Sequence, residues 1–219
     1  MSEPVSANPS AIRDYFETHY LTVAAVAAKS GVTSNRVRAL EKAGCIPAHT
    51  HEWRDETVVT GVFGEFRFPG AAVFYYHPSV VDWIRRTAAF AEDMPLADLA
   101  AAMRGRFATE LLEAIGDREP PWPDPVNYAW AYILDGTWGA CLKDICPESM
   151  LAKEYARKAI RDLRAKNRKP TKAQRKELVQ HVKGYERVAM PFAPHEVPAC
   201  SRTREILPAV QDWNLEATF

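Results

Sequence analysis

The chain lacks the features that would place it in a disulfide-rich, secreted or membrane class. Its 219 residues contain only four cysteines, at irregular spacing, so no disulfide framework is indicated and buried thiols are the default. No apolar run approaches the roughly 20 residues that span a membrane. The opening residues, MSEPVSANPS, lack the basic-then-apolar pattern of a signal peptide. We therefore expect a cytoplasmic protein that does not contact a membrane.

Motifs for nucleotide and hydrolase chemistry are missing as well. The sequence has no phosphate-cradling glycine loop, no dinucleotide-binding fingerprint and no hydrolase nucleophile elbow. It also contains no internal repeat and no low-complexity segment. The cofactor therefore stays unknown at this stage, because no motif points to one.

The chain has no net charge, because its 28 basic residues balance its 28 acidic residues. Their distribution is uneven, however. Residues 1–117 hold 11 Lys and Arg against 15 Asp and Glu, whereas residues 118–219 hold 17 against 13. DNA affinity depends largely on neutralising phosphates, so an acidic first half disfavours DNA binding unless its cations are concentrated on one face.

The segment Leu21–Pro47, LTVAAVAAKSGVTSNRVRALEKAGCIP, has the pattern of a helix-turn-helix. Apolar residues at helical spacing come first, Thr33 is a good N-cap for a second helix, and Gly44 is suited to end it. Four polar residues of the second helix fall on its solvent side, where such helices contact DNA: Asn35, Arg36, Arg38 and Lys42. An ordinary solvated face would have the same pattern.

Strand-like alternation follows over residues 52–76, and two helices are predicted after it, from Pro78 to about Ala91 and from Leu96 to Ile115. This order resembles the DNA-binding domain of the MerR-type regulators, on the segment given above and on YYHPSVVDWIRRTAAF. The resemblance covers about Tyr20–Leu99 and implies a winged helix-turn-helix. The segment HTHEWRDE departs from that family because it is more acidic than basic.

Four prolines in REPPWPDP, residues 118–125, exclude a helix interior and a central strand, and mark a linker. We therefore expect a domain at 1–117 and a second at 126–219, after a short disordered lead. The second domain is predicted to be helical over 127–134, 147–165 and 171–189, the last opened by a capping box of Thr171 and Gln174. The predicted fold class is mainly α with a small β-wing.

Two stretches of the second half could carry chemistry: DGTWGACLKDICPESMLAK (135–153) and PFAPHEVPACSRTR (191–204). Three prolines predict an extended, rigid path for the second stretch, which is typical of sites. His195 could act as a general base, although a lone histidine among aromatic residues is commonly structural. Along an extended backbone Glu196 would face away from His195. Ser201 is interpreted as the N-cap of a short helix over Arg202–Leu207.

A zinc site is a weaker alternative for the same stretches. Its ligands would be Cys141, Cys146, His195 and Cys200. The knuckle glycines of structural zinc sites are absent, so buried thiols are the simpler interpretation.

The segments GTWGACLKDICPESMLAKEYARKAIRDL and PFAPHEVPACSRTREI resemble a family of bacterial proteins of unknown function, described only as natural-product biosynthesis proteins. The resemblance spans nearly the whole chain. Its motifs map to Trp130–Cys141, to Pro147, Glu148 and Lys153, and to Phe192–Arg202. It implies a role in specialised-metabolite assembly, either catalytic or accessory, without naming a substrate.

Two functions remain open, and an interaction adaptor is a third, since six tryptophans would suit one. The first is a small-molecule-binding enzyme or accessory protein that uses the winged unit as a scaffold and the cleft between the halves as its site. Its partner would be a metabolite or a pathway enzyme. The candidate catalytic residues are His195, Glu196 and Cys141. The candidate substrate contacts are Trp138, Lys143, Glu148, Lys153, Ser201 and Arg202, with Lys153 and Arg202 binding anionic groups.

The second function is a MerR-like transcription regulator that binds DNA through Asn35, Arg36, Arg38 and Lys42. Its C-terminal domain would sense a ligand. A homodimer is the expected form for such a regulator.

Overall fold

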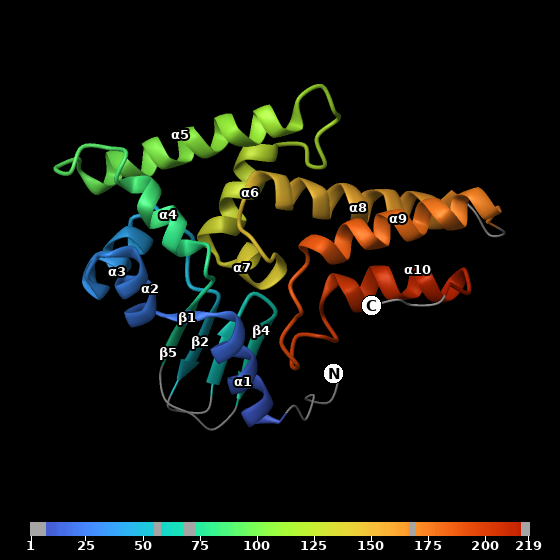
Figure 1. Ribbon diagram of the computed structural model, residues 1–219, viewed down its shortest axis with the longest axis horizontal. Helices are drawn as coiled ribbons and strands as arrows, with labels where there is room; N and C mark the ends of the chain where they lie inside the picture. The colour runs from blue at the N-terminus through green and yellow to red at the C-terminus, as the bar shows by residue number, and fades with distance from the viewer. Residues whose placement is uncertain (1–7, 55–57, 68–72, 167–169, 216–219) are drawn as a thin grey trace.

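The computed structural model describes residues 8–54, 58–67, 73–166 and 170–215. Helices dominate these residues, and a five-stranded antiparallel sheet lies in the first half (Figure 1). This confirms the mainly α fold class with a small sheet. The elements of the first half are α1 (Pro9–His19), β1 (Leu21–Thr22), α2 (Val23–Ser30), α3 (Ser34–Lys42), β2 (His51–Arg54), β3 (Val58–Gly61), β4 (Gly64–Arg67), β5 (Val73–Tyr76), α4 (Val80–Thr87) and α5 (Leu96–Ile115).

Helices α2 and α3 form the predicted helix-turn-helix. The Thr33 hydroxyl accepts a hydrogen bond from the backbone N–H of Arg36 at 3.1 Å, as an N-cap should. Gly31 ends α2 with a φ of 73°, and Gly44 follows α3 with a φ of 74°, in the left-handed region that glycine adopts without strain. Val37 and Leu40 point into the core.

The sheet has the strand order β1-β5-β2-β3-β4. Strand β2 is central, and its Trp53 lies opposite Val59 of β3 and Val73 of β5. Helix α1 packs on this sheet, where Phe16 contacts the Trp53 and Tyr75 rings. The predicted strands are confirmed, whereas the predicted Pro69-Gly70 turn lies outside the described residues. The predicted disordered lead was residues 1–10; residues 1–7 lie outside the described residues, and α1 already begins at Pro9.

The second half consists of helices joined by short connections. They are α6 (Pro125–Leu134), α7 (Thr137–Cys141), α8 (Pro147–Lys166), α9 (Lys172–Val188), the π-helical turn η1 (Arg202–Ile206) and α10 (Leu207–Asp212). Thr171 and Gln174 form the predicted capping box at the start of α9. Helix α7 was not predicted, and α4 is shorter than the predicted helix from Pro78 to Ala91. None of the helices in the described ranges is long and apolar enough to cross a membrane.

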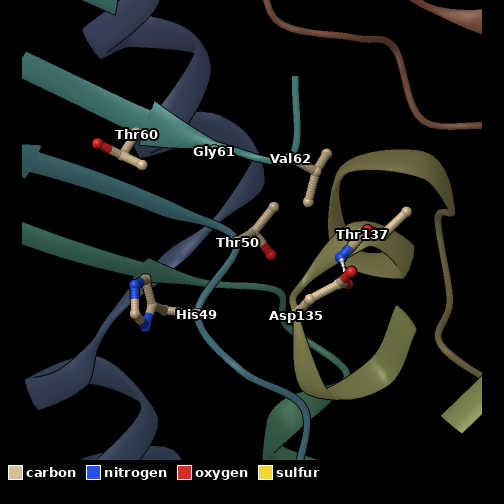
Figure 2. Close-up of a pocket in the computed structure, with 7 residues that line it drawn as sticks. All are labelled: His49, Thr50, Thr60, Gly61, Val62, Asp135 and Thr137. Atoms are coloured by element: carbon tan, nitrogen blue, oxygen red, sulfur yellow. Dashed lines mark hydrogen bonds between the residues drawn. The ribbon is translucent and has the colours of Figure 1, made fainter. Parts of the chain in front are cut away.

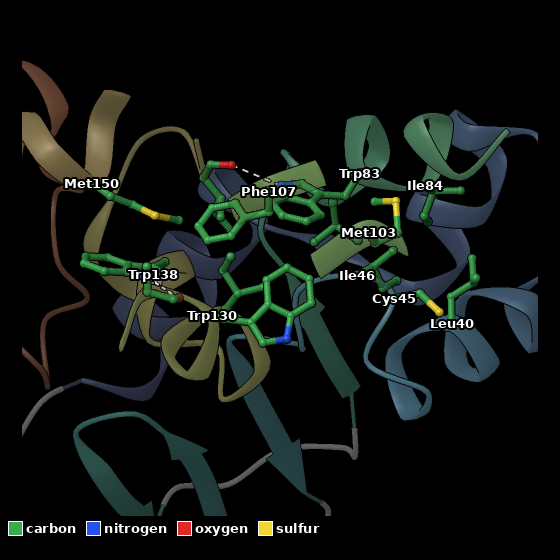
Figure 3. Close-up of a cluster of buried hydrophobic side chains, with 14 of the residues drawn as sticks. Leu40, Cys45, Ile46, Trp83, Ile84, Met103, Phe107, Trp130, Trp138 and Met150 are labelled. Carbon is green, nitrogen blue, oxygen red and sulfur yellow. Dashed lines mark hydrogen bonds between the residues drawn. The ribbon is translucent and has the colours of Figure 1, made fainter. Parts of the chain in front are cut away.

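The largest hydrophobic cluster continues across the proline-rich segment 118–125. Trp83 and Phe107 of the first half meet Trp130 of the second, with ring centroids 6.0 and 5.5 Å from the Trp130 ring (Figure 3). The indole N–H of Trp83 also donates to the carbonyl of Ile145 at 3.0 Å. The division into two domains stays a prediction, and the two halves share this core.

The halves also meet backbone to backbone, where residues 48–50 run past α6 and α7. The amide of Ala48 donates to the carbonyl of Ile133 at 3.2 Å. A Cβ added at Gly136 would lie 2.5 Å from the His49 carbonyl oxygen, and one added at Gly139 would lie 2.1 Å from the Thr50 hydroxyl. Only glycine permits an approach this close.

We expect Gly136→Ala to destabilise the fold by more than about 2 kcal/mol, because the new Cβ meets the His49 carbonyl and alanine is strained at positive φ. Gly136 has a φ of 81°. The matched control is Gly105→Ala in α5, where a Cβ meets nothing within 4 Å and helix propensity adds about 0.5–1 kcal/mol. Urea denaturation of the two variants measures both changes. Equal stabilities would show that the approach is not tight.

Candidate functional site

A pocket of about 220 Å³ lies at the junction of the two halves (Figure 2). Five of its lining residues belong to the first half and two to the second: His49, Thr50, Thr60, Gly61, Val62, Asp135 and Thr137. Figure 2 shows His49 and Thr60 on one side and Asp135 and Thr137 on the other, with Thr50 between them. We call this the junction pocket.

His49 lines the junction pocket, and its ring is hydrogen-bonded to α3. Its Nδ1 lies 2.6 Å from Oε1 of Glu41 in α3, and its backbone N–H donates to the same oxygen at 2.8 Å. The Tyr76 hydroxyl donates to the other oxygen, Oε2, at 2.6 Å. The side chains of His49 and Glu41 are 31% and 17% exposed, so the imidazole is the solvent-facing end of this chain of hydrogen bonds.

Thr50 contributes a buried hydroxyl to the wall of the pocket. The residue is 2% exposed, and its Oγ1 makes no hydrogen bond to any residue that the structure describes. A buried hydroxyl without a partner costs about 1–3 kcal/mol. The hydroxyl lies against Gly139, where an added Cβ would be 2.1 Å from its oxygen, so a polar ligand group or a water molecule that reached this corner of the pocket would supply the missing hydrogen bond.

A second group of unsatisfied polar atoms lies directly behind Gly61. A Cβ added at Gly61 would lie 3.0 Å from Nδ1 of His51 and 3.5 Å from Oε1 of Glu196. These two side chains are fully buried, and the two atoms are 3.6 Å apart, beyond hydrogen-bond distance. Neither the imidazole nor the carboxyl makes a hydrogen bond within the described chain. Gly61 therefore contacts both this pair and the pocket, which it lines.

Burial sets the protonation of the pair. It raises the pKa of Glu196 from its ordinary value of 4.5 to about 8, with the Ala193 backbone acting in the opposite direction. It lowers the pKa of His51 well below 6.5, and the nearby His195 and His49 lower it further. At neutral pH Glu196 is therefore mostly a carboxylic acid and His51 a neutral imidazole, which is a proton donor beside a proton acceptor.

Aromatic rings enclose the pair. The Phe16 ring stacks on His51 with centroids 4.4 Å apart, and Tyr20 meets His51 edge to face at 4.8 Å. His195 packs against Phe66 at 4.7 Å, and burial lowers its pKa to about 4. Water is excluded from these side chains, which strengthens every electrostatic interaction among them.

The loop that carries His195 and Glu196 differs from the expected extended path. It is a succession of turns, in which the amide of Glu196 donates to Ala193 at 2.8 Å and the amide of Cys200 to Glu196 at 3.1 Å. The prolines fix φ but permit turns. As a result both side chains are buried in the same region, and the inference that they face apart was wrong.

Cys141 and Lys153 lie in the same buried region as Glu196. Burial raises the pKa of the Cys141 thiol, while the Lys153 ammonium acts in the opposite direction. Lys153 is 1% exposed, and its Nζ lies 5.8 Å from the centroid of the Phe192 ring. Neither residue lines the junction pocket.

Three other predicted substrate contacts, Arg202, Lys143 and Ser201, instead bind residues near the C-terminal end of α9. Arg202 binds Glu186 through two nitrogens at 2.8 and 2.6 Å, and Lys143 donates to the Glu186 carbonyl at 2.8 Å. Ser201 makes no capping bond, contrary to the prediction, because its hydroxyl pairs with Tyr185 at 2.6 Å. These side chains already have protein partners.

The remaining two substrate-contact candidates also lie away from the pocket. Trp138 is buried and donates its indole N–H to the Ala129 carbonyl at 2.9 Å. Glu148 is exposed in the first turn of α8, where a carboxylate interacts favourably with the helix dipole. Their assignment as substrate contacts stays a prediction.

The zinc alternative finds no support in the described chain. No group of three or more His, Cys, Asp or Glu within it could hold a metal ion. The four candidate ligands, Cys141, Cys146, His195 and Cys200, are free of disulfides and do not gather into a site.

The DNA-contact candidates keep their solvent positions on α3. Asn35, Arg38 and Lys42 are exposed, and Arg36 is half-buried. The β3–β4 hairpin, which the sequence predicts to be a wing, packs on the second half. Its Phe63 lies 6.0 Å from Phe192, and its Phe66 contacts His195. DNA contact stays a prediction for α3, while this face of the hairpin is already occupied.

Sequence reasoning named none of the pocket residues individually as site candidates, although Asp135 and Thr137 lie in the stretch 135–153 that it singled out. His49, Thr50 and His51 lie in the short segment HTHEW, where two histidines at alternate positions were an available signal. Glu41 lies only eight residues before His49, but Glu196 is far from His51 in sequence. Gly61 and Gly136 had no pattern that indicated a pocket.

Comparison with known proteins finds a family match for part of the chain. Residues 122–212, less than half of the chain, match a family of unknown function (DUF6058). The matched region contains Asp135, Thr137 and the His195–Glu196 loop, and it does not reach the helix-turn-helix. No curated protein and no solved structure matches the chain.

The pH dependence of stability tests the buried pair. Between its unfolded value of 4.5 and about 8, Glu196 holds a proton only in the folded chain, so stability falls as pH rises toward 8. Burial lowers the pKa values of His51, His77 and His195. Below pH 6.5 these three groups therefore make stability rise as pH rises. Above 6.5 Glu196 dominates, and the wild type should lose about 1–2 kcal/mol by pH 8.

Urea unfolding at several pH values across this window measures the slope, which Glu196→Gln should abolish. Glu148→Gln, which changes an exposed carboxylate, should retain it. An unchanged slope in Glu196→Gln would contradict the assignment of a buried protonated carboxyl.

Proposed function

We propose that the protein binds a small polar metabolite in the junction pocket and acts as an enzyme or accessory protein of natural-product biosynthesis. The observation that supports this is the set of unsatisfied polar atoms at the pocket: the Thr50 hydroxyl on its wall, and His51 and Glu196 behind Gly61. Buried polar groups normally have hydrogen-bond partners, so such a concentration is typical of a ligand site.

The charges at the pocket restrict the ligand. Its lining includes the carboxylate of Asp135 and neither lysine nor arginine. The cations proposed as anion-binding groups lie elsewhere, since Arg202 binds Glu186 and Lys153 lies against Phe192. An uncharged or cationic molecule is therefore favoured over a phosphate or a carboxylate. A volume of about 220 Å³ suits a small molecule.

The helix-turn-helix serves this function as a scaffold. Glu41 of α3 holds His49 in the pocket, and the β3–β4 hairpin lies on the loop that carries Glu196. The natural-product context comes from the sequence resemblance described above. The match of residues 122–212 to a family of unknown function is compatible with it and names no activity.

Native mass spectrometry of the protein after incubation with an extract of polar bacterial metabolites tests the proposal. We expect a bound small molecule whose affinity falls about tenfold in Thr50→Val, because one hydrogen bond is lost. The ligand-free variant should be as stable as the wild type or more stable, since the hydroxyl has no partner there. Thr109→Val on the exposed face of α5 is the control. Absence of any bound compound, or equal binding by Thr50→Val, would contradict the proposal.

A DNA-binding regulator is the second candidate, favoured by the exposed Asn35, Arg38 and Lys42 on a well-formed α3. Fluorescence anisotropy of labelled duplexes between about 50 and 200 mM salt measures it. Regulator function predicts micromolar binding that weakens steeply with salt. Arg38→Ala and Lys42→Ala should each reduce the salt slope by about one. Lys158→Ala, which removes a cation from α8, should not change it. Absence of binding at the lowest salt would exclude this candidate.

A further inference from the structure

We propose that His49 is the proton-accepting catalytic residue of the junction pocket and that Glu41 is its positioning residue. The inference deepens the proposed function, because it assumes that the substrate occupies this pocket. It assigns a reaction class, proton abstraction from an O–H or N–H group of an uncharged or cationic molecule. The argument depends on three hydrogen bonds, on the position of the imidazole and on the surrounding charges.

The first step is the state of Glu41. Its carboxylate accepts hydrogen bonds from the His49 ring, the His49 backbone and the Tyr76 hydroxyl, at 2.6, 2.8 and 2.6 Å. Burial would raise its pKa, but these hydrogen bonds lower it. Glu41 is therefore ionised at neutral pH, held in one orientation by three donors.

The second step is the tautomer of His49. An ionised carboxylate only accepts hydrogen bonds, so Nδ1 of His49 must be the donor. In the neutral imidazole the other nitrogen, Nε2, then carries the lone pair. Nε2 makes no hydrogen bond to the residues described, and the side chain is 31% exposed. Phe74 meets the ring edge to face at 4.9 Å and restricts its rotation.

The third step is the charge around the ring. Glu41 on α3 and Asp135 across the pocket are acidic, His51 is held neutral by burial, and the Tyr76 hydroxyl is protonated because burial and Glu41 raise its pKa. Among cations, the Arg38 charge acts on Tyr76 and lowers its pKa slightly against these larger effects. An imidazolium formed at His49 is thus paired with the Glu41 carboxylate.

The proposed step is a simple proton transfer. The proton of the substrate O–H or N–H moves to Nε2 of His49, and the bonding electron pair stays on the substrate oxygen or nitrogen. Glu41 stabilises the resulting imidazolium through Nδ1 and is not itself protonated. A carboxylate that orients and stabilises a histidine in this way is a recurrent device in enzymes.

Carbethoxylation by diethyl pyrocarbonate, followed by peptide mass spectrometry, measures the reactivity of each imidazole without needing the substrate. His181 on α9 is the internal reference, because its exposure of 34% is close to that of His49 and its neighbour Glu177 lies 3.8 Å away, too far to position it. At neutral pH we expect His49 to react faster than His181. Glu41→Gln should slow His49 severalfold, because an amide no longer fixes Nδ1 as the donor and Nε2 as the free lone pair, and leave His181 unchanged. Glu177→Gln should alter neither rate by that factor.

Either of two results would overturn the proposal: His49 reacting no faster than His181 in the wild type, or His49 reacting equally fast in the wild type and in folded Glu41→Gln. Circular dichroism establishes whether Glu41→Gln is folded. If it is not, the wild-type ratio of the two histidines decides alone. A metabolite found by native mass spectrometry should protect His49 from modification, and failure to protect would also overturn the assignment. If no metabolite binds but Glu41→Gln still slows the carbethoxylation of His49, the proposed ligand function fails and the positioning of His49 by Glu41 stands.

Discussion

The backbone contact between residues 48–50 and the turn from α6 into α7 is the constraint on which the molecule depends. Gly136 and Gly139 allow the two chains to approach closer than side chains permit. This approach brings Asp135 and Thr137 to the same pocket as His49 and Thr50. It also places Tyr20 of the first half where its hydroxyl donates to the Gly139 carbonyl, at 3.2 Å. Two halves of opposite net charge thereby share one interior.

Polar atoms in that interior are distributed unequally. Away from the pocket, the buried indoles of Trp83 and Trp138 donate hydrogen bonds, whereas the Trp122 indole has no partner among the described residues. Around Gly61 the Thr50 hydroxyl and the side chains of the His51–Glu196 pair make no hydrogen bond within the described chain. Natural proteins retain such costly groups mainly where function needs them. The same region supplies both the proposed ligand contacts and, in His49, a histidine positioned by a carboxylate.

Local signals made much of the fold predictable. Thr33, Gly44 and the Thr171 capping box fixed helix ends from a few neighbouring residues, and periodic apolar residues located α5 and α8. The site was harder to predict, because one of its main contacts joins residues far apart in the chain. Glu196 was singled out, but its partner His51 lies 145 positions earlier, and no local pattern encodes such a contact. The prolines around His195 were interpreted as stiffness, whereas they allowed the turns that bury it.

The shared core has a consequence for how the chain could be divided. Trp130 lies against Trp83 and Phe107, and the cluster contains residues from both sides of segment 118–125. A fragment limited to the region that matches the family of unknown function would expose this aromatic face to water, at a cost of about 25 cal/mol for each Å² of apolar surface. The proline-rich segment therefore connects two halves that share one hydrophobic cluster, and we expect the second half expressed by itself to be aggregation-prone.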